Sequence, residues 1–419
     1  MKEYMQRAGF WSLLALVIGV QLGLGATILP SNLAPYGVWG ILSFLITGSG
    51  VISLALVFAA LSENSRAGGP YVYVQDAFGD RAAFVAAWSY WIISWVGTVP
   101  ILVFAAGSME MLFGGWSTST AIIVEITILT VITLINLTGV GAGEIIFSAA
   151  RVIPFVVFPF IALKYGSLKN IEIPKDISPM LALNKASLIA LWGFLGIEAG
   201  TTPADTVENP NKTIPRAIIY GTFIVAALYI VNLVSVMSVV PAGALSNSLS
   251  PYATYLEYSM GGDYAKVVSV FIIIVCVGCV KSWILTSGEA AYSAAQEQMF
   301  PSSFAKRNKF ASPYVGVITT SVLMGICGLM LKNNTIKEQI NILIEFCSTA
   351  YLILYMICAV ILGIMMWRRK IAASVMRWSL VTVGLAFCSW AICMARPRDI
   401  IGAAMIPLSG VVLGLFRRK

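Results

Sequence analysis

The chain has 419 residues and a mean hydropathy of +0.86, with 58% hydrophobic and only 11% charged residues. This composition excludes an ordinary water-soluble domain and is typical of a protein that crosses a membrane many times. The formal net charge of +8 would suit a nucleic-acid-binding protein, but the basic residues are spread over short connections rather than gathered in one patch. Nucleic acid is therefore not an expected partner.

Apolar segments long enough to cross a bilayer recur along the whole chain. A spanning helix needs about 20 apolar residues, and this length predicts twelve spans with no soluble domain between them. The spans are 10–30, 37–61, 82–112, 119–138, 146–165, 186–204, 216–240, 264–296, 312–331, 338–366, 374–395 and 399–416. The first lacks a cleavage-like end, so it is predicted to be a retained helix. Residues 1–419 are thus predicted to form one all-α membrane domain.

The basic residues alternate between the two ends of these spans. Of the 27 lysines and arginines, 17 lie at the end shared with the N-terminus, nine at the opposite end and one within a span. Because basic residues favour cytoplasmic connections, both termini are predicted to be cytoplasmic. The 17 residues are Lys2, Arg7, Arg66, Arg81, Arg151, Lys212, Arg216, Lys306, Arg307, Lys309, Arg368, Arg369, Lys370, Arg377, Arg417, Arg418 and Lys419.

Glycines interrupt the first and sixth spans. Residues 19–30 read Gly-Val-Gln-Leu-Gly-Leu-Gly-Ala-Thr-Ile-Leu-Pro, and residues 191–203 read Leu-Trp-Gly-Phe-Leu-Gly-Ile-Glu-Ala-Gly-Thr-Thr-Pro. Interrupted spans five helices apart indicate two inverted five-helix repeats whose broken helices meet at a binding site. The repeats would cover approximately 10–165 and 186–366, leaving two helices at approximately 374–416 outside them. Glycines that merely permit close helix packing are the alternative.

Glu198 lies in the interrupted sixth span. A carboxylate at membrane depth costs roughly 2.5–3.5 kcal/mol on insertion scales, so it usually faces a cavity. Residues at helical spacing in other spans could face the same cavity: Tyr90, Ser94, Thr98 and Ile101 in the third, Trp192 and Leu195 in the sixth, Trp283 in the eighth, and Cys347, Tyr351 and Tyr355 in the tenth. Their aromatic rings would attract a guanidinium or ammonium group if these faces converge. Each ring taken alone could instead pack against lipid or the protein core.

The other charged residues and the cysteines in the spans give weaker indications of function. Lys281 and Glu289 are eight residues apart on the eighth span, hence roughly on one face. Lys281 could neutralise a buried acid, take the position of a coupling cation, or be ion-paired for packing alone. Cys276 and Cys279 are better explained as small packing residues than as a metal site, because the chain has no histidine. We expect no metal and no cofactor, and the lack of a nucleophile–base set disfavours an enzyme.

Three motifs connect these features to a known family. Gly68-Gly-Pro-Tyr-Val-Tyr73, Gly196-Ile-Glu198 and Glu208-Asn-Pro-Asn-Lys-Thr-Ile-Pro-Arg216 resemble motifs of the amino acid–polyamine–organocation superfamily. The resemblance runs from the first span to at least the tenth and is greatest to the basic amino acid/polyamine antiporters. It implies a broken-helix, inverted-repeat fold. It also implies exchange of an amino acid for its decarboxylated amine, with arginine and agmatine as the expected pair.

The resemblance also implies roles for the gate residues. Trp192 matches a tryptophan that covers the substrate from outside, and Trp283 matches one that forms a middle gate. Tyr90, Glu198 and Tyr355 match a set that closes the cytoplasmic path. Protonation of Glu198 would then make exchange dependent on pH.

The residues around the substrate depart from the family. Leu24 stands where the family has serine, Thr98 replaces an asparagine, and Cys347 replaces a serine. Backbone amides of 23–25 would hold the substrate carboxylate. The expected substrate-binding residues are Gln21, Gly23, Leu24, Gly25, Ile93, Ser94, Thr98, Trp192, Leu195, Trp283 and Cys347, with the charge of Lys281 as a secondary candidate.

These features together predict a multi-pass antiporter of a bacterial inner membrane that works by alternating access. Its expected partners are small amino acids and amines and the lipid bilayer, and the two C-terminal helices could form a homodimer face. A proton-coupled symporter or exchanger of neutral amino acids or other polyamines is an alternative, because Leu24 and Thr98 make the site less polar. A non-transporting amino acid sensor on the same fold is a second alternative.

Overall fold

The computed structural model describes residues 8–65, 68–135, 142–203, 206–248, 250–331 and 336–416. Within these ranges the regular structure is helical, and one isolated bridge joins Ala8 to Val207. A helix satisfies its own backbone hydrogen bonds, which a segment in hydrocarbon requires. Six of the basic residues on which the orientation was predicted lie outside the described residues: Lys2, Arg7, Arg66, Arg417, Arg418 and Lys419.

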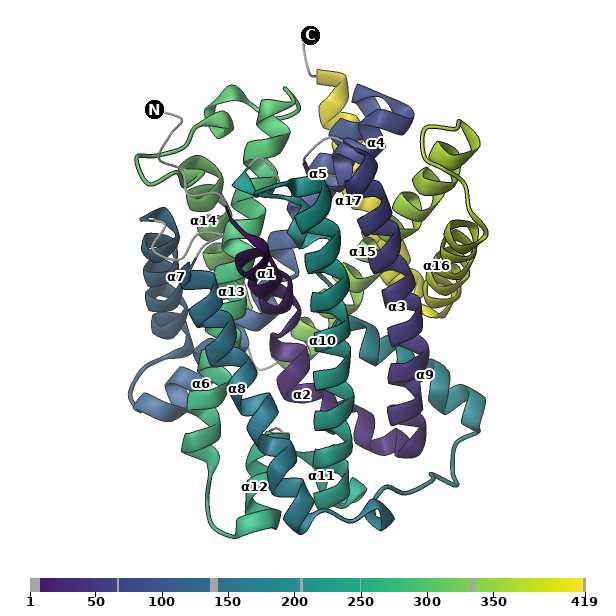
Figure 1. Ribbon diagram of the computed structural model, residues 1–419. Helices are drawn as coiled ribbons and strands as arrows, with labels where there is room; N and C mark the ends of the chain where they lie inside the picture. Colours follow the sequence, from purple (N-terminus) through teal and green to yellow (C-terminus); the bar gives the residue numbers. More distant parts are fainter. Residues whose placement is uncertain are drawn as a thin grey trace.

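The helices follow one another through short connections (Figure 1). In chain order they are α1 (Phe10–Gln21), α2 (Leu24–Leu33), η1 (Ala34–Tyr36), α3 (Val38–Asn64), α4 (Pro70–Phe78), α5 (Asp80–Val96), α6 (Val99–Phe113), α7 (Thr118–Leu134), α8 (Ala142–Tyr165), η2 (Leu168–Asn170), α9 (Pro179–Trp192), η3 (Ala199–Thr201), α10 (Pro210–Val239), α11 (Ala242–Asn247), α12 (Pro251–Met260), α13 (Ala265–Gln296), η5 (Ser302–Ala305), α14 (Tyr314–Met330), α15 (Ile336–Trp367), α16 (Val375–Met394) and α17 (Pro397–Phe416).

Eight helical segments are long and apolar enough to cross a membrane. They are α3, α5 with α6, α8 from Glu144, α10, α13, α15 from Ile342, α16, and α17 to Leu415. The pair α1 and α2 would make a ninth span, bent by 42° at its break. Two shorter apolar helices, α7 and α14, correspond to further predicted spans. The protein is therefore a multi-span integral membrane protein, as its composition predicts.

The broken pair α1 and α2 lies in the middle of the bundle. α1 packs against α8, α10 and α13, while α2 contacts α9, α10 and α13. Figure 1 shows α1 and α2 (purple) between α8 and α10, near the middle of the bundle. α13 also contacts α5, α6, α7 and α14, so it connects the broken pair to the rest of the bundle.

The break in α1 exposes its last four carbonyl groups, and four different groups satisfy them. The carbonyl oxygen of Ile18 accepts from the amide of Leu22 at 2.9 Å. The carbonyl oxygens of the next three residues accept from side chains: Gly19 from Arg151 Nη1 at 2.5 Å, Val20 from Trp283 Nε1 at 3.2 Å, and Gln21 from the Tyr229 hydroxyl at 2.9 Å. Since an unsatisfied buried carbonyl is costly, these bonds make the break a stable feature of the fold.

Two local expectations are corrected by the structure. The third predicted span turns at Gly97 and Thr98, because Pro100 has no amide to continue the hydrogen bonds of α5. Arg151 was counted among the basic residues of cytoplasmic connections, but it lies within α8 and is fully buried. A buried acid, Glu144, stabilises the charge of Arg151 at this position.

Candidate functional site

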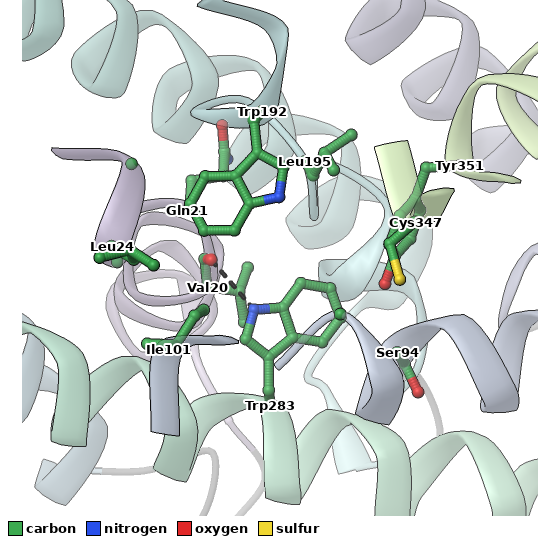
Figure 2. A pocket seen from close by; sticks show the side chains of 13 residues that line it. Val20, Gln21, Leu24, Ser94, Ile101, Trp192, Leu195, Trp283, Cys347 and Tyr351 are labelled. Carbon is green, nitrogen blue, oxygen red and sulfur yellow. Dashed lines mark hydrogen bonds between the residues drawn. The ribbon is translucent and has the colours of Figure 1, made fainter. Parts of the chain in front are cut away.

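A small cavity lies where α1 ends and α2 begins (Figure 2). Its volume is about 30 Å³, which is room for one or two water molecules but not for an amino acid. Residues of α1, α2, α5, α6, α9, α13 and α15 line it, together with the break between α1 and α2 and parts of the turns that follow α5 and α9. The lining residues are Val20, Gln21, Gly23, Leu24, Gly25, Ser94, Gly97, Ile101, Trp192, Leu195, Trp283, Cys347 and Tyr351.

Most of the predicted substrate-binding residues meet at this cavity. Of that set, only Ile93 and Thr98 are absent from the lining. Both are buried, but the Thr98 hydroxyl donates to the carbonyl oxygen of Ser94 at 2.8 Å. Thr98 lies in the turn after α5, whereas Ile101, beyond that turn, does line the cavity. The Ser94 hydroxyl is in turn hydrogen-bonded to Ser287 of α13 at 2.8 Å.

Two tryptophans point toward one another from opposite sides of the cavity (Figure 2). Trp283 is fixed by its hydrogen bond to the carbonyl oxygen of Val20, and its ring centroid lies 6.1 Å from that of Tyr351. Trp192 packs over the start of α2, where a methyl group added at Gly25 would lie 3.1 Å from the indole ring. Glycine at this position therefore allows Trp192 to approach the backbone of α2 closely.

The N-terminus of α2 presents amide groups at the same cavity. Among the described residues, the amides of Leu24 and Gly25 have no hydrogen-bond acceptor. A helix N-terminus carries a partial positive charge and donates hydrogen bonds readily to an anion. The cavity therefore combines a carboxylate-binding end with aromatic rings suited to a cation.

Glu198 lies in the turn between α9 and η3 and is fully buried. Tyr355 of α15 donates a short hydrogen bond to Oε2 of Glu198 and accepts one from the amide of Gly196 at 3.1 Å. Tyr90 makes an electrostatic contact with Glu198. Among the described residues, however, neither the Tyr90 hydroxyl nor Glu198 Oε1 has a hydrogen bond of good geometry. The three predicted gate residues thus lie close together, and a hydrogen bond joins two of them, Tyr355 and Glu198.

Gly196 holds the turn beside Glu198 in a conformation that other residues rarely adopt. Its φ angle is +101°, and an added methyl group would lie 3.0 Å from both Trp283 and Val20. Glycine tolerates positive φ because it has no Cβ atom. The turn, Trp283 and the end of α1 are therefore packed as one unit.

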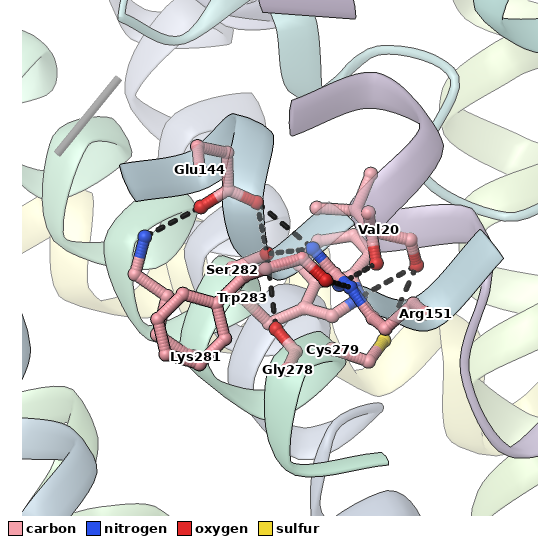
Figure 3. Close-up of polar contacts among 10 residues, drawn as sticks. Val20, Glu144, Arg151, Gly278, Cys279, Lys281, Ser282 and Trp283 are labelled. Carbon is pink, nitrogen blue, oxygen red and sulfur yellow. Dashed lines mark hydrogen bonds and ion pairs between the residues drawn. The ribbon is translucent and has the colours of Figure 1, made fainter. Parts of the chain in front are cut away.

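A charged cluster behind the cavity was only partly predicted (Figure 3). Lys281 Nζ lies 2.5 Å from Glu144 Oε2, so Lys281 does neutralise a buried acid. Glu144 also binds Arg151 at 3.0 Å and the Ser282 hydroxyl at 2.6 Å. Glu144 was not among the residues predicted to be functional, although its spacing of seven residues from Arg151 places both on one helical face.

Glu289 does not share this cluster with Lys281. It forms an ion pair with Arg307, which lies in the connection between α13 and α14, at 2.7 Å. The Arg307 guanidinium also stacks over the ring of Tyr292 at 3.9 Å from the centroid. The two charges that the sequence places on one face of a helix therefore have separate partners.

The cavity offers chemistry for binding a small charged molecule. In the part of the chain that the structure describes, no three histidine, cysteine or acidic residues are placed to hold a metal ion. Cys279 instead contacts the carbonyl oxygen of Val20 at 3.5 Å, consistent with a packing role. The arrangement can orient a small zwitterion or cation between helices that must separate to admit it.

Comparison with known proteins identifies relatives that are membrane transporters of amino acids and amines. The model of the amino acid permease family matches residues 9–412. A putative arginine/ornithine antiporter of Bacillus subtilis (strain 168) is 28% identical, over 85% of this chain and 84% of the relative. The putrescine transporter PotE of Haemophilus influenzae is 28% identical over 89% and 87%. The cadaverine/lysine antiporter of Escherichia coli (strain K12) is 27% identical over 76% and 73%. With a match over nearly its whole length, the chain belongs to the amino acid permease family of membrane transporters, within the amino acid–polyamine–organocation superfamily.

Proposed function

We propose that this chain is a bacterial inner-membrane antiporter that exchanges a basic amino acid for its decarboxylated amine, with arginine and agmatine as the first pair to test. The arrangement of the cavity carries the proposal. Free amides of α2 stand at one end, and the indoles of Trp192 and Trp283 stand above and below the space. The amides suit a carboxylate, and the rings suit a guanidinium or ammonium group.

The names of the relatives support exchange and leave several substrate pairs to compare. One is named for arginine and ornithine, one for cadaverine and lysine, and one for putrescine. All of these molecules carry a side-chain or terminal ammonium or guanidinium group. The shared chemistry supports a cationic amino acid or amine as the substrate class of this chain.

Alternating access would require the small cavity to widen. At about 30 Å³ it is too small for any amino acid, so helices around it must move apart during each cycle. Movement of the broken helices against the rest of the bundle would expose the site to one side at a time. In this scheme Trp192 and Trp283 cover the substrate, and separation of Glu198 from Tyr355, with Tyr90 beside them, opens the cytoplasmic path.

The same proposal includes a topology of twelve spans in one transport domain, residues 1–419. The eight candidate spans, the bent pair, the shorter helices α7 and α14, and α9 with the turn that follows it would provide the twelve. The broken first and sixth spans would then begin two inverted five-helix repeats, leaving α16 and α17 outside them. The distribution of basic residues supports cytoplasmic termini. A homodimer through α16 and α17 is part of this proposal by analogy with the family.

The decisive experiment is exchange in proteoliposomes made with the purified protein. Vesicles loaded with agmatine should take up labelled arginine many times faster than empty vesicles. The same measurement should be made with ornithine and putrescine and with lysine and cadaverine. For each pair, the amino acid is tested inside the vesicles with the amine outside, and the reverse. Uptake that is independent of the internal amine, for every pair, would rule out the proposed exchange.

A second candidate is transport of a neutral amino acid, coupled to protons. The apolar side chains of Leu24, Ile101 and Leu195 in the cavity lining favour it. Uptake of neutral amino acids into empty vesicles, driven by an imposed pH gradient, would identify this function. A sensor without transport activity would instead bind a ligand and give no flux with any member of the panel.

A further inference from the structure

One tyrosine of the cavity lining has a hydroxyl group with no hydrogen bond inside the described part of the chain. Tyr351 of α15 is only 2% exposed, and its hydroxyl is among the buried polar atoms without a partner. A buried polar group in this state is unfavourable, so it marks a place where a ligand or water can bind. Tyr351 was not among the predicted substrate-binding residues, although the sequence places it on an inward face.

Two other polar side chains of the lining are already engaged within the protein. The Ser94 hydroxyl is hydrogen-bonded to Ser287 at 2.8 Å, and Nε1 of Trp283 donates to the end of α1. Oε1 of Gln21 also lacks a partner among the described residues, but Nε2 of the same amide donates to the carbonyl oxygen of Val17 at 3.1 Å. The Gln21 amide is therefore anchored along its own helix, α1.

Tyr351 lies across the cavity from the start of α2. Figure 2 shows Tyr351 and Cys347, both on α15, to one side of the two indole rings and Leu24 of α2 to the other side. The free amides of α2 and the free hydroxyl of α15 therefore lie on opposite sides of the cavity. A ligand held between the indoles would place one end at each.

The buried carboxyl group of Glu198 acts on the Tyr351 side. It interacts electrostatically with Tyr351 and accepts the hydrogen bond of Tyr355, one helical turn further along α15. The charged cluster between α8 and α13 instead reaches α1, where Arg151 binds the carbonyl oxygen of Gly19 at 2.5 Å. A tyrosine hydroxyl can accept or donate a hydrogen bond, and a neighbouring carboxylate favours a cationic donor over a second carboxylate. The Tyr351 side therefore suits the cationic end of a ligand.

From this geometry we infer that the Tyr351 hydroxyl accepts a hydrogen bond from the side-chain guanidinium or ammonium group of the ligand, and so selects basic ligands over apolar ones. The inference rests on the proposed function, which supplies the basic ligand. The carboxylate of the amino acid then lies at the free amides of α2, and the amine leaves those amides unused. Both exchanged ligands keep the side-chain cation, so Tyr351 serves both halves of the exchange.

The test removes the hydroxyl and keeps the ring. Tyr351→Phe should weaken the binding of arginine and of agmatine each about tenfold, equal to about 1.4 kcal/mol, and leave the ratio of the two affinities unchanged. Norleucine ends in a methyl group instead of a cation, so it should bind the variant as tightly as the wild-type protein. Competition against labelled arginine on detergent-purified protein gives all three affinities without requiring transport.

Tyr255→Phe is the matched control. Tyr255 is equally buried, but it lies outside the cavity lining and its hydroxyl donates to the carbonyl oxygen of Phe158 at 2.6 Å. This variant should leave the preference for arginine over norleucine unchanged, which separates the loss of a buried hydroxyl in general from its loss at the cavity.

Two results for Tyr351→Phe would overturn the inference. A loss of equal size for arginine, agmatine and norleucine would show that Tyr351 only shapes the cavity, and unchanged affinities for all three would show that its hydroxyl is not used. Either result leaves the exchange function intact. Failure of the wild-type protein to exchange any amino acid for any amine would instead reject the proposed function.

A measurement on the unaltered protein covers the case in which Tyr351→Phe does not fold. Wild-type protein should bind arginine and lysine each at least tenfold more tightly than norleucine. Equal affinities for the basic amino acids and norleucine would contradict the inference directly.

Discussion

The chemistry of the candidate gate depends on single hydrogen bonds. Tyr355 donates to Glu198 and accepts from the amide of Gly196, so one hydroxyl joins α15 to the turn after α9. Hydrogen bonds to charged groups contribute about 1.5–3 kcal/mol, more than bonds between neutral groups. A bond of this strength can hold a path closed and still break within a transport cycle.

Removing the charge of Glu198 should slow exchange. We expect Glu198→Gln and Tyr355→Phe each to lower the exchange rate at least tenfold, about 1.4 kcal/mol, because the gate bond is weakened or lost. Glu198→Ala should abolish or uncouple exchange and leave membrane insertion intact. Initial rates in proteoliposomes measure the effect, with Tyr220→Phe on the exposed face of α10 as the control. Wild-type rates in Glu198→Ala would remove Glu198 from the gate.

The backbone of Gly196 provides a second prediction at this scale. Gly196→Ala would force a side chain into a φ of +101° and against Trp283 and Val20, at a cost of about 1–3 kcal/mol. We expect a lower melting temperature in detergent and weaker ligand binding. Gly107→Ala in α6 is the matched control, because nothing lies within 4 Å of the added methyl group. Equal melting temperatures for both variants would show that the turn tolerates a side chain.

Among the elements, the broken helix α1 decides where the site forms. Its last carbonyl groups are bound by side chains from α8, α10 and α13, so three helices fix the point at which the backbone leaves the helix. One of these side chains, Arg151, depends on the acid Glu144 for its own stability. The position of the cavity is therefore coupled to the charge cluster between α8 and α13.

This coupling predicts a non-additive effect on stability. Glu144→Gln removes the anion that two buried cations share and should destabilise the protein by about 3–5 kcal/mol. Adding Lys281→Gln removes one of those cations and should restore part of the lost stability, although each change alone is destabilising. Thermal unfolding of the single and double variants in detergent measures the interaction. Strictly additive losses would mean that the two side chains stabilise the fold independently.

At the scale of the whole molecule, the bundle positions the site between helices that are far apart in sequence. Cavity residues come from the first helix and from α15, more than 300 residues later. The connection after α15 contacts α4, where Arg368 donates to the carbonyl oxygen of Ala77 at 3.1 Å. Such long-range contacts connect both predicted repeats at one end of the bundle.

The proposed topology can be tested by labelling from outside the cell. The exposed Cys393 is first changed to serine, and one cysteine is then introduced at Lys175 or at Arg369. A membrane-impermeant thiol reagent should label Lys175→Cys in spheroplasts, and Arg369→Cys only after permeabilisation. The reverse pattern would invert the proposed orientation, and labelling of both positions from outside would exclude an odd number of spans between them.

The sequence by itself determined the class of protein, most of the helices and most of the cavity residues. Long apolar runs require helices in a bilayer, and the glycines near positions 23 and 196 mark places where a helix can stop. Periodicity could therefore assign Ser94, Cys347 and Tyr351 to inward faces. Thr98, in the turn between α5 and α6, is absent from the lining, although Ile101 beyond the same turn belongs to it.

Only the tertiary structure decided which charges meet. Glu144 and Arg151 lie on α8 and Lys281 on α13, separated in sequence by 137 residues between the acid and the lysine. Nothing in local sequence distinguishes Glu144 as the partner of Lys281 from Glu289, which is nearer in sequence but binds Arg307. Ion pairing depends on distance in space, and packing of the helices sets that distance. The same packing makes the lysine part of a buried charged cluster beside the cavity.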